Sequence, residues 1–252
     1  MNYEIGDFFL STNSVGNISD DEYKKVELLI NAAKAFARST YQCIYIIDYF
    51  KREFLYASEN LALLCGQPID KILSFGYNLY LDHVPKKEVE MLLEINEKGF
   101  DLFQKIPLCE RKDYSIQYDF HLTNGRKAYL IHHTLTPLVM TLDGKIWLAL
   151  CTISMSSRSK PGHIIMKKEN SKKYYEYDLF RHQWVLKEEK PLSETERDVL
   201  WLSTQGYTMN EIAEKLCKSV DTIKSCKRIL FTRLNVKNIA EALYHVVNYR
   251  LV

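Results

Sequence analysis

The sequence of 252 residues predicts an α+β protein, with a five-stranded antiparallel sheet and helices, a small β-rich connector and a C-terminal domain of four helices. Three observations lead to this fold class. Apolar and polar residues alternate from Tyr114 to Thr123, which is the two-residue period of a half-buried strand. The segment 156–162, which contains Ser, Lys, Pro and Gly, predicts a boundary between two parts of the chain. The residues after 190 repeat the signals that begin and end helices.

The first domain is expected over residues 1–158. It begins with a helix over 20–38, in which apolar residues recur at helical spacing. These residues are Val26, Leu29, Ile30, Ala33 and Phe36. The runs 43–48 and 53–57 are rich in β-branched and aromatic residues and are followed by a helix signal, so they predict a hairpin of two strands.

Helices are expected between this hairpin and the remaining strands. Ser58 predicts the N-cap of a short helix that ends near Gly66, because a hydroxyl can accept an unpaired N–H and glycine readily ends a helix. Residues 67–104 are expected to be mostly helical, and Asp70 and Pro85 are the start signals within them.

Three further strands, 114–123, 126–141 and 145–154, predict an antiparallel meander. The dipeptides Asn124-Gly125 and Asp143-Gly144 separate them and supply the positive φ angles of tight turns. Strand-like pieces follow within residues 159–190, and we expect them to form a β-rich connector or an outer extension of either neighbouring domain. These pieces are 164–166, 174–177 and 183–186.

The third domain, 191–252, is expected to hold four helices. Ser193 with Glu196 and Thr208 with Glu211 are capping boxes, and Asn238 with Glu241 is a looser version. Gly206 follows the first helix and predicts its end. The expected helices are 194–205, 209–216, 220–235 and 239–248.

The helix over 220–235 is amphipathic. One face carries Val220, Ile223, Leu230, Phe231 and Leu234. The opposite face carries Asp221, Lys224, Ser225, Arg228 and Thr232. Residues 218–237 hold six basic residues and one acidic residue, a net +5 in a chain whose total is +2, whereas residues 1–190 hold 25 of each. Such a concentration is typical of a surface that binds a phosphate backbone.

Only three residues, 217–219, join this helix to the one before it, which predicts a helix-turn-helix. The surrounding sequence resembles the DNA-binding domain of the LuxR/GerE family of bacterial transcription regulators. The similarity is carried by Leu192–Leu200 (LSETERDVL), Gly206, Asn210–Ala213 (NEIA), Thr222–Lys224 and Leu234–Val236. Asn235 departs from the glycine that is common in the family at that position, but asparagine also tolerates the left-handed conformation.

The resemblance implies a dimer that binds a partly palindromic operator in double-stranded DNA, with helix 220–235 in the major groove. We expect Arg228 and Ser225 to contact base edges and Lys224 to contact phosphate or base. Lys227 lies near the apolar face, so its stem is expected along the core with its ammonium toward phosphate. The remaining expected DNA contacts are Lys218, Thr222 and Thr232. The resemblance also implies that the last helix supplies a dimer contact, through Ala240, Leu243 and Val247.

The element order of residues 1–158, with Asp82-His83-Val84-Pro85 before the long helix, resembles a PAS domain, a bacterial sensory module. This resemblance implies a PAS-like sheet that binds an unidentified small molecule, or a ligand-free dimerisation domain. No cofactor or metal is expected. A haem would need an axial histidine, but histidines in strands and turns are usually hydrogen-bonded structural residues. The histidines considered are His83, His121, His132 and His133.

Other classes of function are excluded by what the sequence lacks. It has no nucleophile elbow, no phosphate-binding glycine loop and no metal-ligand spacing, so an enzyme is not expected. The six scattered cysteines, the absence of a signal peptide and the absence of a long apolar run predict a cytoplasmic protein without a membrane span. The function expected is therefore DNA-binding transcription regulation under a PAS-like input domain. The alternative is an interaction or dimerisation module whose PAS-like domain binds a partner and no small ligand.

Overall fold

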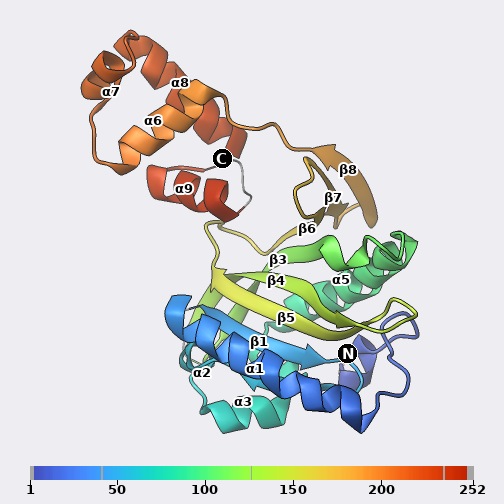
Figure 1. The fold of residues 1–252 in the computed structure, drawn as a ribbon. Coiled ribbons are helices and arrows are strands. Elements are labelled where there is room, and N and C mark those ends of the chain that lie inside the picture. Colours follow the sequence, from blue (N-terminus) through green and yellow to red (C-terminus); the bar gives the residue numbers. More distant parts are fainter. Residues whose placement is uncertain (1–2, 41, 126, 235, 249–252) are drawn as a thin grey trace. The chain divides into compact units, whose positions relative to one another are not determined.

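The computed structural model describes residues 3–40, 42–125, 127–234 and 236–248. It divides the chain into two compact units, Met1–Lys187 and Glu188–Val252. The first unit is built on one antiparallel sheet with the strand order β2-β1-β5-β4-β3-β6-β7-β8 (Figure 1). Helices make up the second unit, so the α+β class is confirmed. None of the described helices is long and apolar enough to cross a membrane.

Strands β1 (Cys43–Asp48) and β2 (Glu53–Ala57) form the expected hairpin at one edge of the sheet. Helix α1 (Asp20–Thr40) packs on one face of this region through Val26, which joins Ile46 and Trp147 in a buried cluster. Phe36 was expected on the packed side of this helix, but its side chain is 50% exposed. Ala37 takes the inward position instead, and neighbouring helical residues point about 100° apart.

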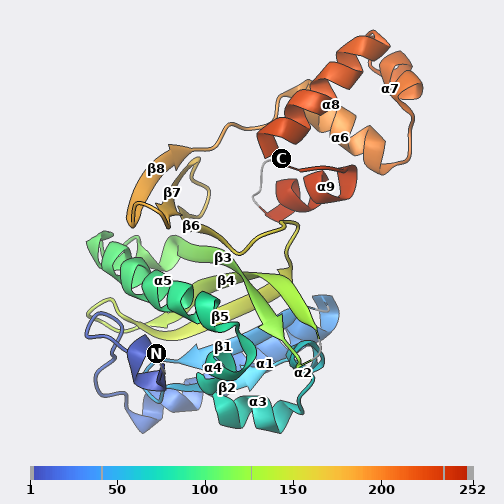
Figure 2. The same ribbon diagram turned by 180° about the vertical axis from the view of Figure 1, so that it is seen from behind.

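The opposite face of the sheet carries the main hydrophobic core, which is covered by a short 3₁₀ turn, η1 (Ile5–Phe8), and by a series of helices (Figure 2). These helices are α2 (Glu59–Cys65), α3 (Ile69–Phe75), α4 (Asn78–His83) and α5 (Lys86–Lys105). Gly66 ends α2 in the left-handed conformation, and Pro85 is the N-cap of α5, as expected. Ser58 is the N-cap residue of α2, but its hydroxyl accepts the N–H of Ile44 at 2.9 Å and does not cap the helix.

A second 3₁₀ turn, η2 (Arg111–Asp113), leads into the meander of β3 (Tyr114–Thr123), β4 (Ala128–Met140) and β5 (Ile146–Met155). Its strands pair antiparallel as predicted, with Tyr118 opposite His133 and Asp119 opposite His132. Gly125 and Gly144 have φ angles of 80° and 78°, so both predicted tight turns are confirmed.

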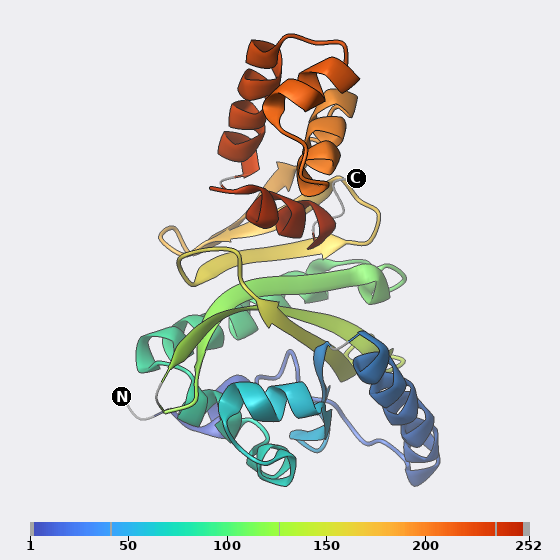
Figure 3. The same ribbon diagram turned by 90° about the vertical axis from the view of Figure 1, so that its left-hand side faces the viewer.

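The sheet has eight strands instead of the expected five. β6 (Gly162–Lys168), β7 (Lys173–Asp178) and β8 (Gln183–Glu188) continue it beyond β3 and do not form a separate connector (Figure 3). β6 pairs with β3 and thereby satisfies the backbone groups at an edge that would otherwise be open. Ile164 and Met166 on β6 also join the main core. Of the two expectations for these strands, the outer extension is therefore the one observed.

The second unit contains α6 (Glu194–Thr204), α7 (Met209–Lys215), α8 (Val220–Leu234) and α9 (Ile239–Asn248), each within a residue of its predicted bounds. Both capping boxes are formed at the starts of α6 and α7. The side chain of Asn238 likewise accepts the N–H of Glu241 at 2.9 Å. Gly206 follows α6 with a φ of 88°, which is its predicted role as a terminator. Asn235 lies outside the described residues.

Candidate nucleic-acid interface and internal cavity

A tight turn joins helices α7 and α8, and backbone hydrogen bonds within the turn stabilise it. Cys217 adopts a left-handed φ of 51°, and the N–H of Lys218 donates to the carbonyl of Ala213 at 2.9 Å. Ser219 then begins α8, because its hydroxyl oxygen accepts the N–H of Thr222 at 3.1 Å. The free N–H groups at this helix start carry partial positive charge, which favours an anionic partner nearby.

The apolar sides of the helices meet in a small core. Val199 on α6, Ile212 and Ala213 on α7, and Ile223 on α8 are all buried there. Leu230 and Leu234 are buried as well, so the apolar face predicted for α8 is its packed face. Half-buried Cys226 packs against the same core, which fixes the rotation of α8 about its axis.

The other face of α8 is open to solvent. Six of the seven residues expected to contact DNA are exposed: Lys218, Thr222, Lys224, Ser225, Arg228 and Thr232. Lys227 is half-buried, and its ammonium lies 5.4 Å from the ring centroid of Phe231. The hydroxyl of Thr232 donates to the carbonyl of Arg228 at 2.9 Å, so its proton is already engaged within the helix.

One of the six basic residues around α8 has a structural role that its sequence position does not reveal. Nη2 of Arg233 lies 3.1 Å from Oε2 of Glu196 on α6, and their side chains are only 28% and 10% exposed. The charge of Arg233 is therefore balanced within the chain. The basic surface that remains is centred on Lys218, Lys224 and Arg228.

Helix α9 packs inward through Ala242 and Val246, both buried. Ala240 is exposed and the side chain of Leu243 is 37% exposed, so two of the three residues expected at a dimer contact are accessible. The side chain of Val247 lies outside the described residues.

The first unit contains a cavity of about 60 Å³ between the sheet and the helices. Aromatic and aliphatic side chains line most of it, together with Asn96 and Ser115, and none of the lining residues is charged. The hydroxyl of Tyr77 is buried there without a hydrogen bond of good geometry among the described residues, and Tyr49 is its polar neighbour. Burial raises the pKa of Tyr77 well above its ordinary value, so the phenol stays neutral.

Beside the cavity, three buried polar side chains form a chain of hydrogen bonds. The Tyr45 hydroxyl bonds to that of Tyr80, which lines the cavity, and lies 2.7 Å from Nε2 of His133. Burial lowers the pKa of His133 from 6.5 to about 3, so this imidazole is neutral. Its Nδ1 has no partner among the described residues.

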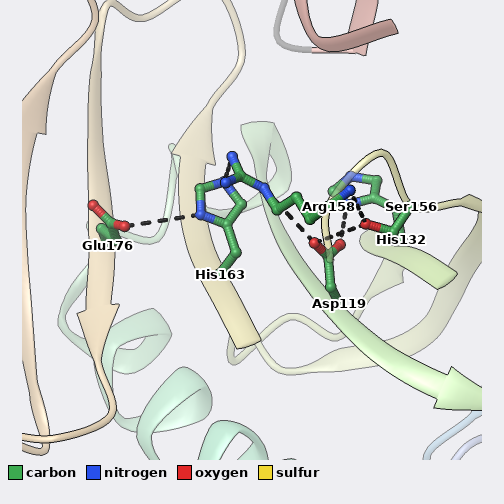
Figure 4. Close-up of polar contacts among 6 residues, drawn as sticks. All are labelled: Asp119, His132, Ser156, Arg158, His163 and Glu176. Atoms are coloured by element: carbon green, nitrogen blue, oxygen red, sulfur yellow. Dashed lines mark hydrogen bonds and ion pairs between the residues drawn. The ribbon is translucent and has the colours of Figure 1, made fainter. Parts of the chain in front are cut away.

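The other three histidines considered as haem ligands also engage protein groups. Nδ1 of His83 lies 2.6 Å from the carbonyl oxygen of Thr123. Nδ1 of His121 lies 2.8 Å from Glu88. His132 belongs to a polar cluster with Asp119 (Figure 4). Because side chains alternate along β4 and Leu135 lines the cavity, His132 points to the other face of the sheet. No metal-binding group of His, Cys, Asp or Glu occurs within the described ranges.

Asp119 is the centre of this cluster and is 1% exposed. Its Oδ1 lies 2.7 Å from Nδ1 of His132, and its Oδ2 accepts the hydroxyl of Ser156 at 3.1 Å. The Ser156 proton is thus directed to a carboxylate and not to a histidine nitrogen, so the arrangement differs from that of an activated serine nucleophile.

The cluster continues toward β6 and β7 (Figure 4). Nε of Arg158 lies 3.8 Å from Oδ2 of Asp119, and its Nη2 lies 2.6 Å from Nε2 of His163. Nδ1 of His163 lies 3.9 Å from Glu176 on β7. The cluster therefore ties the segment that follows β5 to the strands on both of its sides.

The helical unit matches known regulators. The family model for bacterial regulatory proteins of the luxR family matches residues 190–246. The transcriptional activator protein BglJ of Escherichia coli (strain K12) is 35% identical over 61 residues, which are 24% of this chain and 27% of BglJ. The chain thus spans about a quarter of the length of this curated relative.

Two solved structures are similar to the chain at a lower level. The VqmA dimer of Vibrio cholerae in the absence of target DNA is 12% identical, and the match covers 93% of this chain and 89% of that one, with a TM-score of 0.31. A phage VqmA in complex with DPO is 13% identical over 91% of each chain, with a TM-score of 0.31. Scores of this size do not establish a common fold. The family match, with the helix-turn-helix geometry, shows that residues 190–246 are a helix-turn-helix domain of the luxR family of bacterial regulatory proteins.

Proposed function

We propose that the protein is a transcription regulator that binds operator DNA as a dimer through α8, under the control of its first unit. The observation that carries this proposal is the division of α8 into two faces. Ile223, Leu230 and Leu234 are buried, while Lys224 and Arg228 are exposed and form no ion pair within the described residues.

Each exposed residue has a role that follows from its chemistry. Arg228 and Ser225 contact base edges, where a good base contact contributes about 1–3 kcal/mol of discrimination. Lys224 contacts phosphate or base, and Lys218 and Lys227 contact phosphate. Thr222, in the first turn of α8, and Thr232 complete the interface. Ala240, Leu243 and Val247 on α9 supply a dimer contact.

The test uses Lys224→Ala and Arg228→Ala in the full chain. Bound sites are first mapped across the genome with the wild-type protein, and the most enriched duplex becomes the probe. Both variants are expected to bind it more weakly at matched salt while their thermal unfolding is unchanged. Arg197→Ala, an exposed arginine on α6, is the matched control. Wild-type affinity in both variants would contradict the proposed interface.

We further propose that the cavity in the first unit binds a small uncharged molecule that controls the regulator. A cavity needs about 10–15 Å³ of accessible space to hold one water molecule. The 60 Å³ of this cavity therefore holds about four waters or a compact organic molecule. A cavity without charged side chains favours a neutral ligand, and Tyr77 offers it a hydroxyl that lacks a well-formed hydrogen bond.

Native mass spectrometry of gently purified protein and thermal shifts against a metabolite panel test this second proposal. Leu135→Phe, which fills the cavity wall, is expected to abolish a bound mass or a thermal shift seen with the wild type. Leu148→Met, in the cluster on the other face of the sheet, is the control. An empty wild type with no shift would instead favour the alternative, a first unit that binds a protein partner and no small ligand.

A further inference from the structure

Helix α1 has apolar side chains on the face that it turns away from the sheet. Leu28 is 75% exposed and Phe36 is 50% exposed, although Val26 and Ala37 on the same helix are buried. Ala32 and Ala35 are exposed between them. Residues three or four positions apart share one side of a helix, so these four residues form one continuous strip, called here the α1 strip.

The α1 strip is suited to close helix packing. Its two large side chains stand one at each end, and the two alanines between them leave the helix backbone open to close approach. Exposed apolar residues are ordinary when they are scattered singly, but a continuous strip along a helix is typical of an interaction surface.

The first turn of α1 is acidic and its last turn is basic. Asp20, Asp21 and Glu22 lie in the first turn, and Arg38 lies in the last. Asp21 pairs with Lys24 at 2.6 Å, whereas Asp20 and Arg38 form no ion pair within the described residues. On a helical wheel Asp20 and Arg38 lie on the same flank of the α1 strip.

This charge pattern identifies the occupant as a second α1 that runs antiparallel. In a parallel pair each end of α1 would meet an end of the same charge. In an antiparallel pair the acidic first turn of one helix lies beside Arg38 of the other, and the opposed helix dipoles add to the attraction. A two-fold axis midway between Leu28 and Ala32 places each Leu28 on Ala32 of the second copy.

We propose that the protein self-associates through an antiparallel, two-fold pairing of α1 with α1 of a second copy, in addition to any contact through α9. The inference rests on the proposed dimeric regulator and names one of its interfaces. One helix pair is a small interface, so its contribution comes from multivalency: two chains joined at α1 present two α8 helices to one operator at high effective concentration.

Sedimentation equilibrium of the full chain without DNA tests the pairing by charge reversal. Arg38→Glu is expected to raise the dimer dissociation constant about tenfold, because acid then faces acid. The double variant Asp20→Arg with Arg38→Glu is expected to restore wild-type association, since a two-fold axis reverses both partners of each pair. Lys105→Glu, in the last turn of α5, is the matched control.

Leu28→Gln tests the contribution of the apolar α1 strip, and it is also expected to raise the dimer dissociation constant about tenfold. Leu63→Gln on α2, where Leu63 is 77% exposed, is its control. Because these side chains are exposed, circular dichroism melting is expected to show folded variants. The proposal is overturned by a monomeric wild type, by wild-type association in both single variants, or by a double variant that stays weak.

These outcomes are separate from the test of DNA binding. If the α1 variants contradict the α1 pairing but Lys224→Ala and Arg228→Ala still weaken binding to the mapped duplex, the proposed DNA-binding function is retained. The dimer contact then lies elsewhere, and α9 is the first alternative. If α1 association holds but those variants bind normally, the pairing stands and the α8 interface is wrong.

Discussion

Arg233 on α8 donates to the same carboxylate oxygen of Glu196 that accepts the backbone N–H and the hydroxyl of Ser193 at the start of α6. One side chain therefore completes a capping box and joins two helices. Because Glu196 is 8% exposed, the pair lies largely out of water. The orientation of α8 thus depends on a carboxylate that is remote from its exposed basic face.

Glu196→Gln is expected to lower the free energy of unfolding of the second unit by about 2 kcal/mol, since it weakens a helix cap and leaves Arg233 without its counter-charge. Native-state hydrogen exchange of the backbone amides of α6 and α8 measures this change in the second unit. Glu214→Gln, at an exposed carboxylate on α7 of the same unit, serves as the comparison and is expected to have little effect. Equal stability of the two variants would contradict a structural role for the Glu196–Arg233 pair.

The two arginines of α8 are expected to differ in their effect on salt dependence. Arg228→Ala should reduce the slope of log binding constant against log salt by up to about one, because an exposed positive charge is lost from the DNA-facing surface. Arg233→Ala should leave that slope nearly unchanged, since the Arg233 charge is already balanced by Glu196. Titration of the mapped duplex at several salt concentrations distinguishes them. A larger change of slope for Arg233→Ala than for Arg228→Ala would reverse this assignment.

The helices of the second unit could be predicted to within a residue because their signals are local. Ser193, Thr208 and Gly206 each act on backbone groups a few residues away, so the sequence contains both the cause and its effect. The exposed face of α8 could be predicted for the same reason, because helical periodicity alone sorts its residues into two faces.

What could not be predicted depends on contacts between distant residues. The pairing of β6 with β3 depends on which strand edge of the sheet is open, and local sequence signals do not identify that edge. The sequence alone counts Arg233 among the basic residues that surround α8, because its partner Glu196 lies far from it in the sequence. Phe36 has the spacing of the inward face, but the rotation of α1 is set by Val26 and Ala37 against the sheet.

Asp119→Ala is expected to destabilise the first unit by about 3 kcal/mol. The substitution removes the acceptor of the Ser156 hydroxyl and the charge that faces Arg158, both in a site that is nearly closed to water. Thermal unfolding of the full chain measures this loss. Glu110→Gln, which weakens the half-exposed pair of Glu110 with Lys168, is the control and is expected to have a much smaller effect. A melting temperature equal to that of the control would mean that the cluster does not hold the segment after β5.

Buried His133 is expected to make the first unit less stable as the pH falls below about 6.5. In the unfolded chain this imidazole binds a proton near its usual pKa of 6.5, whereas burial keeps it neutral in the folded protein down to a pKa of about 3. Between these values the unfolded state binds more protons, so the free energy of unfolding falls by at most about 1.4 kcal/mol per pH unit. Between pH 6.5 and pH 5, this linkage amounts to about 2 kcal/mol.

His133→Phe removes the titrating group, so its unfolding free energy should fall about 2 kcal/mol less than that of the wild type over the same interval. His182→Phe is the control, since the side chain of His182 is 64% exposed. Chemical denaturation at pH 7, 6 and 5 measures the three curves. Parallel curves for the wild type and His133→Phe would show that His133 is protonated in the folded protein. Nε2 of His133 would then donate to the Tyr45 hydroxyl oxygen, because a protonated imidazole can only donate.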